Sequence, residues 1–503
     1  MMPTKPDANP DPIPPAAGPA GLNSGQPAVP TFRFDFPRDT TNQRGASFWL
    51  RPRNLYACRR SFLRRDDSIA WRTPNSKEKT IEPSRTVPFS SLLTARRLAH
   101  PHDNGALFRF IVIADTGEGD RSQYALLPGI NAVDPDFMII NGDVAYPAGR
   151  IQDYVYGFFE PYARLDIPIW AVPGNHDYYS RHHGEEFFEV FCTRKRDDLW
   201  QSHGLRLIPQ PDTYWALTER DEFGGRTEPS WSTQRLMVIG IDTGHGGDLD
   251  GGRRRVLRKG IPFTRKPADV EQLGWLEDRL READAQHKTV IVLFHIPALV
   301  DTKRDEKVRL QGLHQILSNH QSVRLVLCGH IHNYQRYGQA TFRDFVATEF
   351  RRPPRNSPDY IVAGAGGAGL SPTNFKKGPY EAAYVFPSAA DWDAYASRAQ
   401  KALSKWDFVK YSAVNALAGV INQKGPLDDD PTEFGCFLVV DVFPDRASVQ
   451  PFLMTNLAKL YPLRRSGSVI PLNDKQSRIA EAQRDECFAT DTVIPKPPLE
   501  LLF

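Results

Sequence analysis

Side chains that can bind cations or transfer protons follow five short apolar segments of the sequence. In chain order they are Asp115, Asp143, Tyr146, Asn175, His176, Asp177, His295, His330 and His332. The set offers carboxylate, phenol, amide and imidazole groups and no thiolate, which argues against a structural zinc site built from cysteines. Mixed oxygen and nitrogen ligands in this number suit two hard or borderline metal cations.

The apolar segments that precede these side chains predict strands of an α/β fold. Seven short runs of the buried-sheet type are expected at 108–114, 137–141, 169–172, 236–242, 289–294, 324–328 and 360–363. Between them lie helical stretches such as 270–285, where leucines recur on one face beside charged residues. Parallel strands bring the loops at their carboxyl ends to one edge, so we expect the polar side chains to converge there.

The composition is that of a globular protein with no strong preference for polyanions. The chain has 503 residues, 40% hydrophobic and 24% charged, with a net charge of +3. Five scattered cysteines without CxxC spacing indicate neither a disulfide framework nor a thiolate metal site. We expect no sequence-specific nucleic acid partner. No early segment resembles a signal peptide, and the most apolar longer stretch, 411–421, falls short of the ~20 residues that span a bilayer. A cytoplasmic protein is therefore expected, of undetermined oligomeric state.

Changes in composition divide the chain into five predicted parts. Residues 1–30 contain nine prolines and are expected to be a disordered tail. Residues 31–105 form an N-terminal extension with fifteen Lys/Arg and seven Asp/Glu, either a basic contact surface or a lead-in packed on the core. Residues 106–375 are the predicted core. A helical insert is expected at 376–433, and closing strands at 436–443 and 447–454 with a C-terminal tail within 434–503.

Five ordered motifs resemble the calcineurin-like metallophosphoesterase superfamily. They are Asp115-x-Gly117, Gly142-Asp143-x-x-Tyr146, Gly174-Asn175-His176-Asp177, the strand-terminal His295 and Gly329-His330-Ile331-His332, with Gln272 to Leu276 matching the family's helix ahead of the metal histidine. Within the superfamily, Gly117 and Tyr146 are similar to the purple acid phosphatase branch. The resemblance implies a four-layer α-β-β-α sandwich core, here with an N-terminal extension and a C-terminal helical insert.

The resemblance also implies a dinuclear metal centre. Asp115, Tyr146 and His332 would bind one ion, Asn175, His295 and His330 the other, and Asp143 would bridge both. The expected metals are iron paired with iron, manganese or zinc, and a metal-bound hydroxide would be the nucleophile. His176 would contact the phosphate or protonate the leaving group, with Asp177 orienting its imidazole and keeping it cationic. The alternative is that His176 only supports the loop.

Some features depart from the purple acid phosphatase pattern. Tyr146 is either a tyrosinate ligand to Fe(III) or a bystander beside Mn, Zn or Fe(II). Ala114 stands where that branch has glycine, and no further histidine follows His295 until His314. Glu118 and Asp120 are candidates to replace the additional substrate histidine of that branch, as ligands or as hydrogen-bond partners, although surface charges are the simpler interpretation.

Three other features invite weaker interpretations. Residues 364–369 match GxGxxG, but no helix is predicted to follow, so a dinucleotide site is not expected. The basic cluster at 253–266 is either a recruiting surface for anionic substrates or a solvated loop. His182 and His183 either line the pocket rim or are exposed.

We therefore expect a metal-dependent hydrolase of small phosphate esters, a phosphomonoesterase rather than a phosphodiesterase acting on nucleotides or phospholipid head groups. A peripheral membrane enzyme using 31–105 and 411–421 is a weaker alternative. A non-catalytic scaffold is disfavoured because none of the seven candidate ligands is missing.

Overall fold

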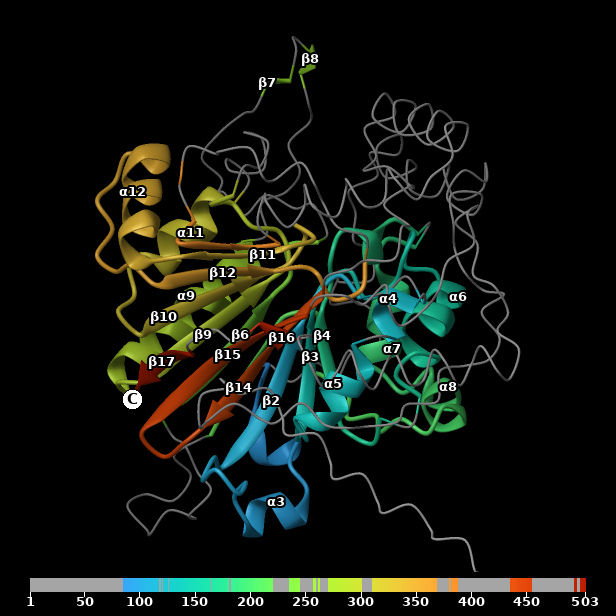
Figure 1. The fold of residues 1–503 in the computed structure, drawn as a ribbon. Coiled ribbons are helices and arrows are strands. Elements are labelled where there is room, and N and C mark those ends of the chain that lie inside the picture. Colours follow the sequence, from blue (N-terminus) through green and yellow to red (C-terminus); the bar gives the residue numbers. More distant parts are fainter. Residues whose placement is uncertain are drawn as a thin grey trace, which may run out of the picture.

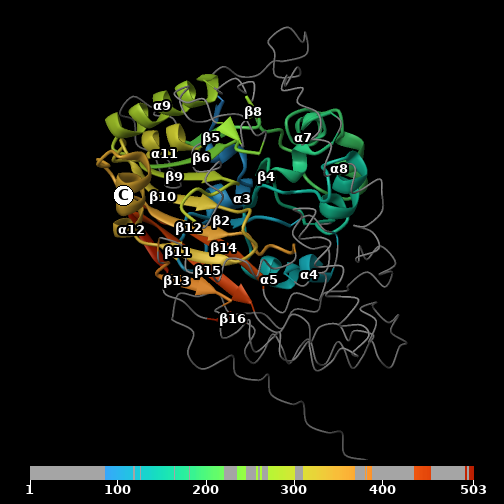
Figure 2. The ribbon, with the colours of Figure 1, turned by 90° about the horizontal axis from the view of Figure 1, so that it is seen from above.

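Two β-sheets stacked face to face form the centre of the molecule, with helices on both outer sides (Figures 1 and 2). The structure is a computed structural model. It describes residues 85–219 apart from Gly117, Glu118, Asp120, Ala125, Arg164 and Arg181, together with residues 235–244, 257–258, 261–262, 270–300, 310–368, 380, 382–387, 435–454, 493–494 and 498–503.

One sheet has eight strands within the described residues. Their order is β1 (Thr86–Val87), β5 (Trp215–Thr218), β6 (Leu236–Ile241), β9 (Thr289–Phe294), β10 (Val323–Cys328), β12 (Asp359–Ala363), β11 (Tyr334–Tyr337) and β13 (Tyr384–Phe386). The central strands β6, β9, β10 and β12 are parallel to their neighbours in this group, whereas β5 and β11 run antiparallel to them.

The other sheet has seven strands among the described residues. Their order is β16 (Val493–Ile494), β15 (Arg446–Met454), β14 (Gly435–Val442), β2 (Phe108–Ile113), β3 (Phe137–Asn141) and β4 (Ile169–Val172), and β17 (Leu499–Leu502) also pairs with β15. Strands β2, β3 and β4 are parallel, and β14 is antiparallel to β2. A separate two-stranded hairpin joins β7 (Leu257–Arg258) to β8 (Ile261–Pro262).

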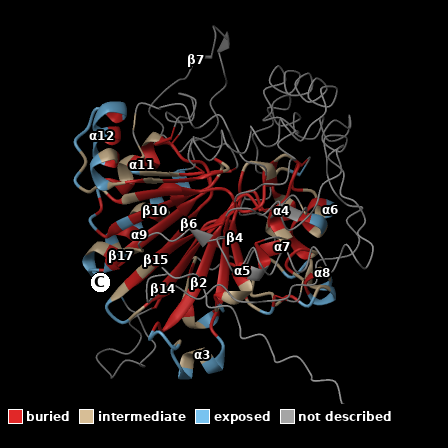
Figure 3. Ribbon diagram, in the orientation of Figure 1, coloured by how far each residue is buried: buried red, intermediate tan, exposed pale blue. Residues whose placement is uncertain are grey.

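The central strands are mainly apolar because both of their faces are buried. In β2, Phe110 and Val112 pack between the sheets, whereas Ile111 and Ile113 face the helices. This alternation follows from the two-residue repeat of a strand. Trp170 of one sheet meets Trp215 of the other with ring centroids 5.1 Å apart. Figure 3 shows this burial running along the central strands, whereas α3 and α12 each keep an exposed face.

Two groups of helices complete the four layers. Beside β2, β3 and β4 lie α4 (Arg121–Tyr124), α5 (Leu127–Ala132), α6 (Ile151–Tyr154), the π-helical η3 (Val155–Phe159), α7 (Glu185–Phe191) and α8 (Asp197–Ser202). The eight-stranded sheet is covered by α9 (Val270–Ala285), α11 (Gln311–Leu317) and α12 (Gln339–Phe350). The predicted four-layer α-β-β-α architecture is thus confirmed.

The described part of the N-terminal extension packs on the core. Besides β1 it contains η2 (Phe89–Ser91) and α3 (Ala95–Ala99). Phe89 contacts Phe108 with ring centroids 5.0 Å apart, and the Arg97 guanidinium lies 2.7 Å from Asp136. The predicted tail 1–30 and most of the predicted helical insert lie outside the described residues. Across the described chain, every helix is too short or too polar to cross a bilayer.

Candidate metal centre

The candidate ligands lie at the carboxyl ends of parallel strands from both sheets. Asp115 and Asp143 follow β2 and β3, Asn175 follows β4, and His295 and His330 follow β9 and β10. Three of them, Asp115, Asp143 and His330, have φ values of 57°, 50° and 69°. Left-handed backbone is costly for residues with a side chain and persists where surrounding contacts impose it, often at functional sites.

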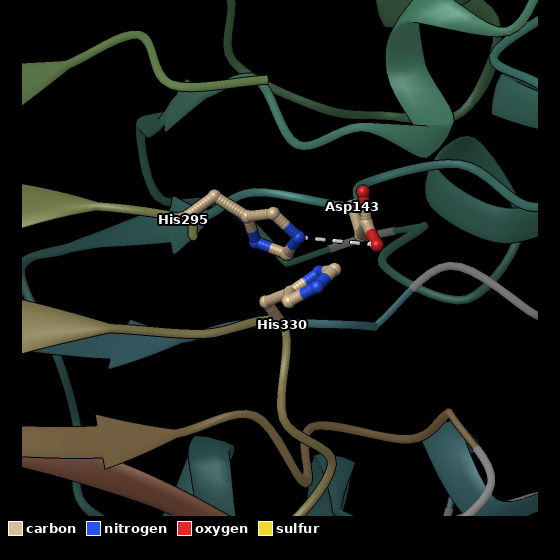
Figure 4. Close-up of side chains that lie close together, drawn as sticks. All are labelled: Asp143, His295 and His330. Carbon is tan, nitrogen blue, oxygen red and sulfur yellow. Dashed lines mark ion pairs between the residues drawn. The ribbon is translucent and has the colours of Figure 1, made fainter. Parts of the chain in front are cut away.

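Asp143, His295 and His330 form a compact group of potential ligands (Figure 4). One ligand atom from each lies within 4.8 Å of the others. His295 Nε2 is 3.2 Å from Asp143 Oδ2, and His295 Nδ1 is 3.0 Å from the carbonyl oxygen of Asn141. If Nδ1 donates to that carbonyl, the lone pair of Nε2 faces the carboxylate.

This arrangement calls for a positive charge between His295 and Asp143. Burial opposes protonation of His295, but the charges of Asp143 and Asp115 outweigh it and raise the pKa of His295 to about 9. Burial likewise opposes ionisation of Asp143, yet the neighbouring charges of His295 and His176 lower the pKa of Asp143 overall. A metal cation would replace the proton, because ligand imidazoles and carboxylates bind in their deprotonated forms.

Two buried atoms support the same interpretation. His295 Nε2 and Asn175 Oδ1 have no hydrogen-bond partner among the described residues. Buried polar atoms in native proteins are usually satisfied, so each such atom needs a ligand, a water or an ion. The donor set therefore fits a metal at this position.

Tyr146 links this group to Asp115 and His332. Its hydroxyl lies 3.2 Å from Asp115 Oδ1, 3.1 Å from Asp143 Oδ2 and 3.2 Å from His332 Nε2. His332 Nε2 also lies 3.2 Å from Asp115 Oδ1. The other carboxylate oxygen, Asp115 Oδ2, accepts a hydrogen bond from the backbone N–H of His330 at 2.8 Å. The three predicted ligands of the first metal, Asp115, Tyr146 and His332, therefore lie within 3.2 Å of one another.

The contacts predicted for Asp177 were wrong. Its carboxylate accepts hydrogen bonds from the backbone N–H groups of Val144, Ala145 and Gly174 at 3.2, 3.2 and 2.8 Å, and from the Tyr154 hydroxyl at 2.8 Å. It therefore joins the loop after β3 to the loop after β4. Burial and the nearby charge of Asp143 raise the pKa of Asp177 to about 7.

His176 is oriented by a different group. Its Nδ1 lies 2.8 Å from the carbonyl oxygen of Pro147, and its backbone N–H donates to Asp143 Oδ1 at 2.8 Å. Burial lowers the pKa of His176, although Asp143 opposes this effect. The structure gives no support to the expectation that Asp177 keeps this imidazole cationic.

Close packing explains the motif glycines. A Cβ on Gly142, whose φ is +91°, would overlap the ring of His295, and a Cβ on Gly174 would overlap Asp143. Close packing also explains Gly364, the first glycine after β12, because a Cβ there would meet Asp115 Oδ2 and the carbonyl of Ile331. Gly364 therefore packs against the candidate ligand Asp115.

Asn141 is a contributor that the sequence motifs do not reveal. Its carbonyl oxygen lies 3.0 Å from His295 Nδ1. Its side-chain Nδ2 donates to the carbonyl oxygens of Phe294 and Leu327 at 3.4 and 3.1 Å. These contacts tie β3 of one sheet to β9 and β10 of the other directly beneath the candidate ligands. The available signal was an amide at the end of an otherwise apolar strand.

Other candidates lie apart from the centre. Buried in α11, His314 is surrounded by aromatic rings of Phe294, Phe342, Phe345 and Tyr360. His182 lies 3.7 Å from Glu185 at the start of α7. Gly117, Glu118, Asp120 and most of the basic cluster 253–266 lie outside the described residues.

Part of the chain matches a known protein family. Residues 108–334 match the family model described as calcineurin-like phosphoesterase. The chain is 26% identical over 231 residues to a Synechococcus protein named a probable cyclic nucleotide phosphodiesterase, covering 44% of this chain and 68% of that protein.

Two solved structures show a distant similarity to the chain. A dimetal phosphatase from Danio rerio has 14% identity and a TM-score of 0.35, covering 69% of this chain and 96% of its own. GAP50, the anchor in the inner membrane complex of Plasmodium, has 12% identity and a TM-score of 0.39, covering 78% and 99%. The family match spans all nine candidate residues from Asp115 to His332. Residues 108–334 therefore belong to the calcineurin-like phosphoesterase family, and the chain is a hydrolase of phosphate esters.

Proposed function

We propose that the chain is a dinuclear metal-dependent phosphoesterase. Asp115, Tyr146 and His332 would hold one cation, and Asn175, His295 and His330 the other. The observation that carries this proposal is the position of Asp143 Oδ2, which lies 3.1 Å from the Tyr146 hydroxyl and 3.2 Å from His295 Nε2. A carboxylate that touches both groups is suited to bridge two cations and to screen their mutual repulsion.

The cations would supply Lewis acidity toward the phosphate and would lower the pKa of an attacking water. The protein residues determine where that chemistry takes place. With Nδ1 donating to the Pro147 carbonyl, Nε2 of the neutral His176 ring is an acceptor. Once protonated, Nε2 would donate to a phosphate or a leaving-group oxygen. Asp177 holds together the two loops that carry Asp143 and Asn175.

The preferred substrates are small phosphomonoesters. This preference follows from the resemblance of Gly117 and Tyr146 to the purple acid phosphatase branch, and the contacts of Tyr146 with Asp115 and His332 support a ligand role for its phenol. Iron paired with iron, manganese or zinc would suit these ligands. Phosphodiesters are the second candidate class, favoured by the similarity to the Synechococcus protein named a probable cyclic nucleotide phosphodiesterase.

Hydrolysis of two chromogenic esters separates the candidates. Metal-free protein is reconstituted with Fe, Mn or Zn and assayed side by side on p-nitrophenyl phosphate and bis(p-nitrophenyl) phosphate, with Asp143→Asn as the blank. Faster monoester turnover is expected. Faster diester turnover would replace the phosphatase proposal with a phosphodiesterase at the same site, and no turnover of either ester by the metal-loaded protein would contradict both.

A further inference from the structure

The orientation of the Asn175 amide is tied to a phenol four residues later. Asn175 Nδ2 donates to the hydroxyl of Tyr179 at 2.8 Å. The other end of the amide, Oδ1, is buried and has no hydrogen-bond partner among the described residues. Only the oxygen end of a carboxamide can bind a cation, because the NH2 end carries two hydrogens and no lone pair to offer.

The local fold brings Tyr179 back to Asn175. Residues His176–Tyr178 form the 3-10 turn η4, in which the N–H of Tyr178 donates to the carbonyl of Asn175 at 3.2 Å. The N–H of Tyr179 donates to the carbonyl of His176 at 3.3 Å. The rings of His176 and Tyr179 pack with centroids 4.8 Å apart, which places the phenol beside the imidazole.

We propose that Tyr179 is a positioning residue for the cation site that contains Asn175. By accepting the hydrogen bond from Nδ2, its hydroxyl satisfies the amide when Oδ1 faces the cation. Without the hydroxyl, that orientation leaves a partly buried NH2 group without its partner, and cation binding has to overcome this cost. This role rests on the proposed function, because it requires Asn175 to be a metal ligand.

The test measures bound Mn²⁺ per chain against free Mn²⁺ on metal-free protein, without any activity assay. Tyr179→Phe removes only the hydroxyl, and we expect it to weaken one Mn²⁺ site by about tenfold to a hundredfold while the other changes little. Tyr178→Phe is the matched control. Its hydroxyl donates to Asp242 at 2.5 Å rather than to a candidate ligand, so both sites should keep their wild-type affinity.

A second background separates positioning from general damage to the loop. In Asn175→Asp either terminal oxygen can bind a cation, so no partner is needed to select one orientation of the side chain, although the Tyr179 hydroxyl can still donate to the oxygen that stays free. Adding Tyr179→Phe to this variant should therefore change Mn²⁺ affinity by less than about threefold, well below the loss of about tenfold to a hundredfold expected when Asn175 is present. Equal weakening in both backgrounds, or wild-type binding by Tyr179→Phe, would overturn the proposal.

Asn175→Ala distinguishes this proposal from the one on which it rests. Loss of one Mn²⁺ site in Asn175→Ala, combined with wild-type binding by Tyr179→Phe, would refute the role of Tyr179 alone. Retention of both sites in Asn175→Ala would refute the proposed ligand set and the positioning role together. Far-UV circular dichroism on each variant checks that the fold is intact.

Discussion

Burial of His314 makes the stability of the fold sensitive to mild acid. The imidazole lies in α11 among aromatic rings, with Nδ1 3.0 Å from the carbonyl of Leu310 and no partner for Nε2 among the described residues. Burial lowers the pKa of His314 from 6.5 to about 4. The folded state therefore binds this proton less readily than the unfolded chain does.

The sign and size of the effect follow from proton linkage. Between pH 6.5 and pH 4 the unfolded state holds more protons, so the free energy of unfolding falls as the pH falls. At pH 5 the folded imidazole is still mostly neutral, whereas its unfolded counterpart is almost fully charged. The resulting difference is about a factor of 30 in the unfolding equilibrium, or about 2 kcal/mol lost between pH 7.5 and pH 5.

Urea unfolding of metal-free wild type and His314→Phe at pH 7.5 and pH 5 tests this reasoning. We expect the wild type to lose about 2 kcal/mol more than His314→Phe, because phenylalanine cannot be protonated. His100→Phe, at an exposed position after α3, serves as the control and should retain the wild-type pH dependence. If His314→Phe lost as much stability as the wild type, protonation of His314 would not be the cause. His314→Leu repeats the test should the larger phenylalanine ring distort the pocket.

Three further predictions concern the metal centre. His176→Ala should lower turnover by roughly 10² to 10⁴ while metal content stays at the wild-type level, and loss of metal would contradict its proposed catalytic role. Tyr146→Phe should abolish the visible charge-transfer band expected of the Fe(III)-loaded protein, and an unchanged spectrum would exclude Tyr146 as a ligand. Gly142→Ala would force a methyl group against His295 and should weaken metal binding at least about tenfold, whereas Gly274→Ala in α9, where a Cβ has open space, should not. Equal metal binding by the two glycine variants would show that the packing around His295 is looser than the structure indicates.

The sequence was most informative where structure and chemistry impose the same residues. The central strands are buried on both faces, so their apolar runs stood out and predicted β3, β4, β9 and the helix α9 with their observed bounds. The motifs after these strands converge because parallel strands end at a common edge. Strand β11, next to the edge strand β13, was missed because it is not a run of apolar residues. Strand β11 reads Tyr-Gln-Arg-Tyr and depends on β12 and β13 for its extended form.

Hydrogen-bond partners could not be predicted from adjacency along the chain. Asp177 follows His176 directly, yet its carboxylate turns to the loop after β3, where several backbone N–H groups need an acceptor. Asn141 and Tyr179 carry no motif signal of their own, and their contacts depend on how the two sheets and a short turn are placed. Such contacts belong to the tertiary fold rather than to local sequence.

The number of metal ions bound per chain tests the central claim most directly. Metal-free protein is equilibrated with excess Mn²⁺, freed of unbound metal and analysed by mass spectrometry, with Asp143→Asn alongside. The proposed site predicts two ions per wild-type chain and weaker binding of both in Asp143→Asn, because that carboxylate touches both ligand groups. One ion or none in the folded wild type, or two in Asp143→Asn with unchanged affinity, would contradict a dinuclear centre bridged by Asp143.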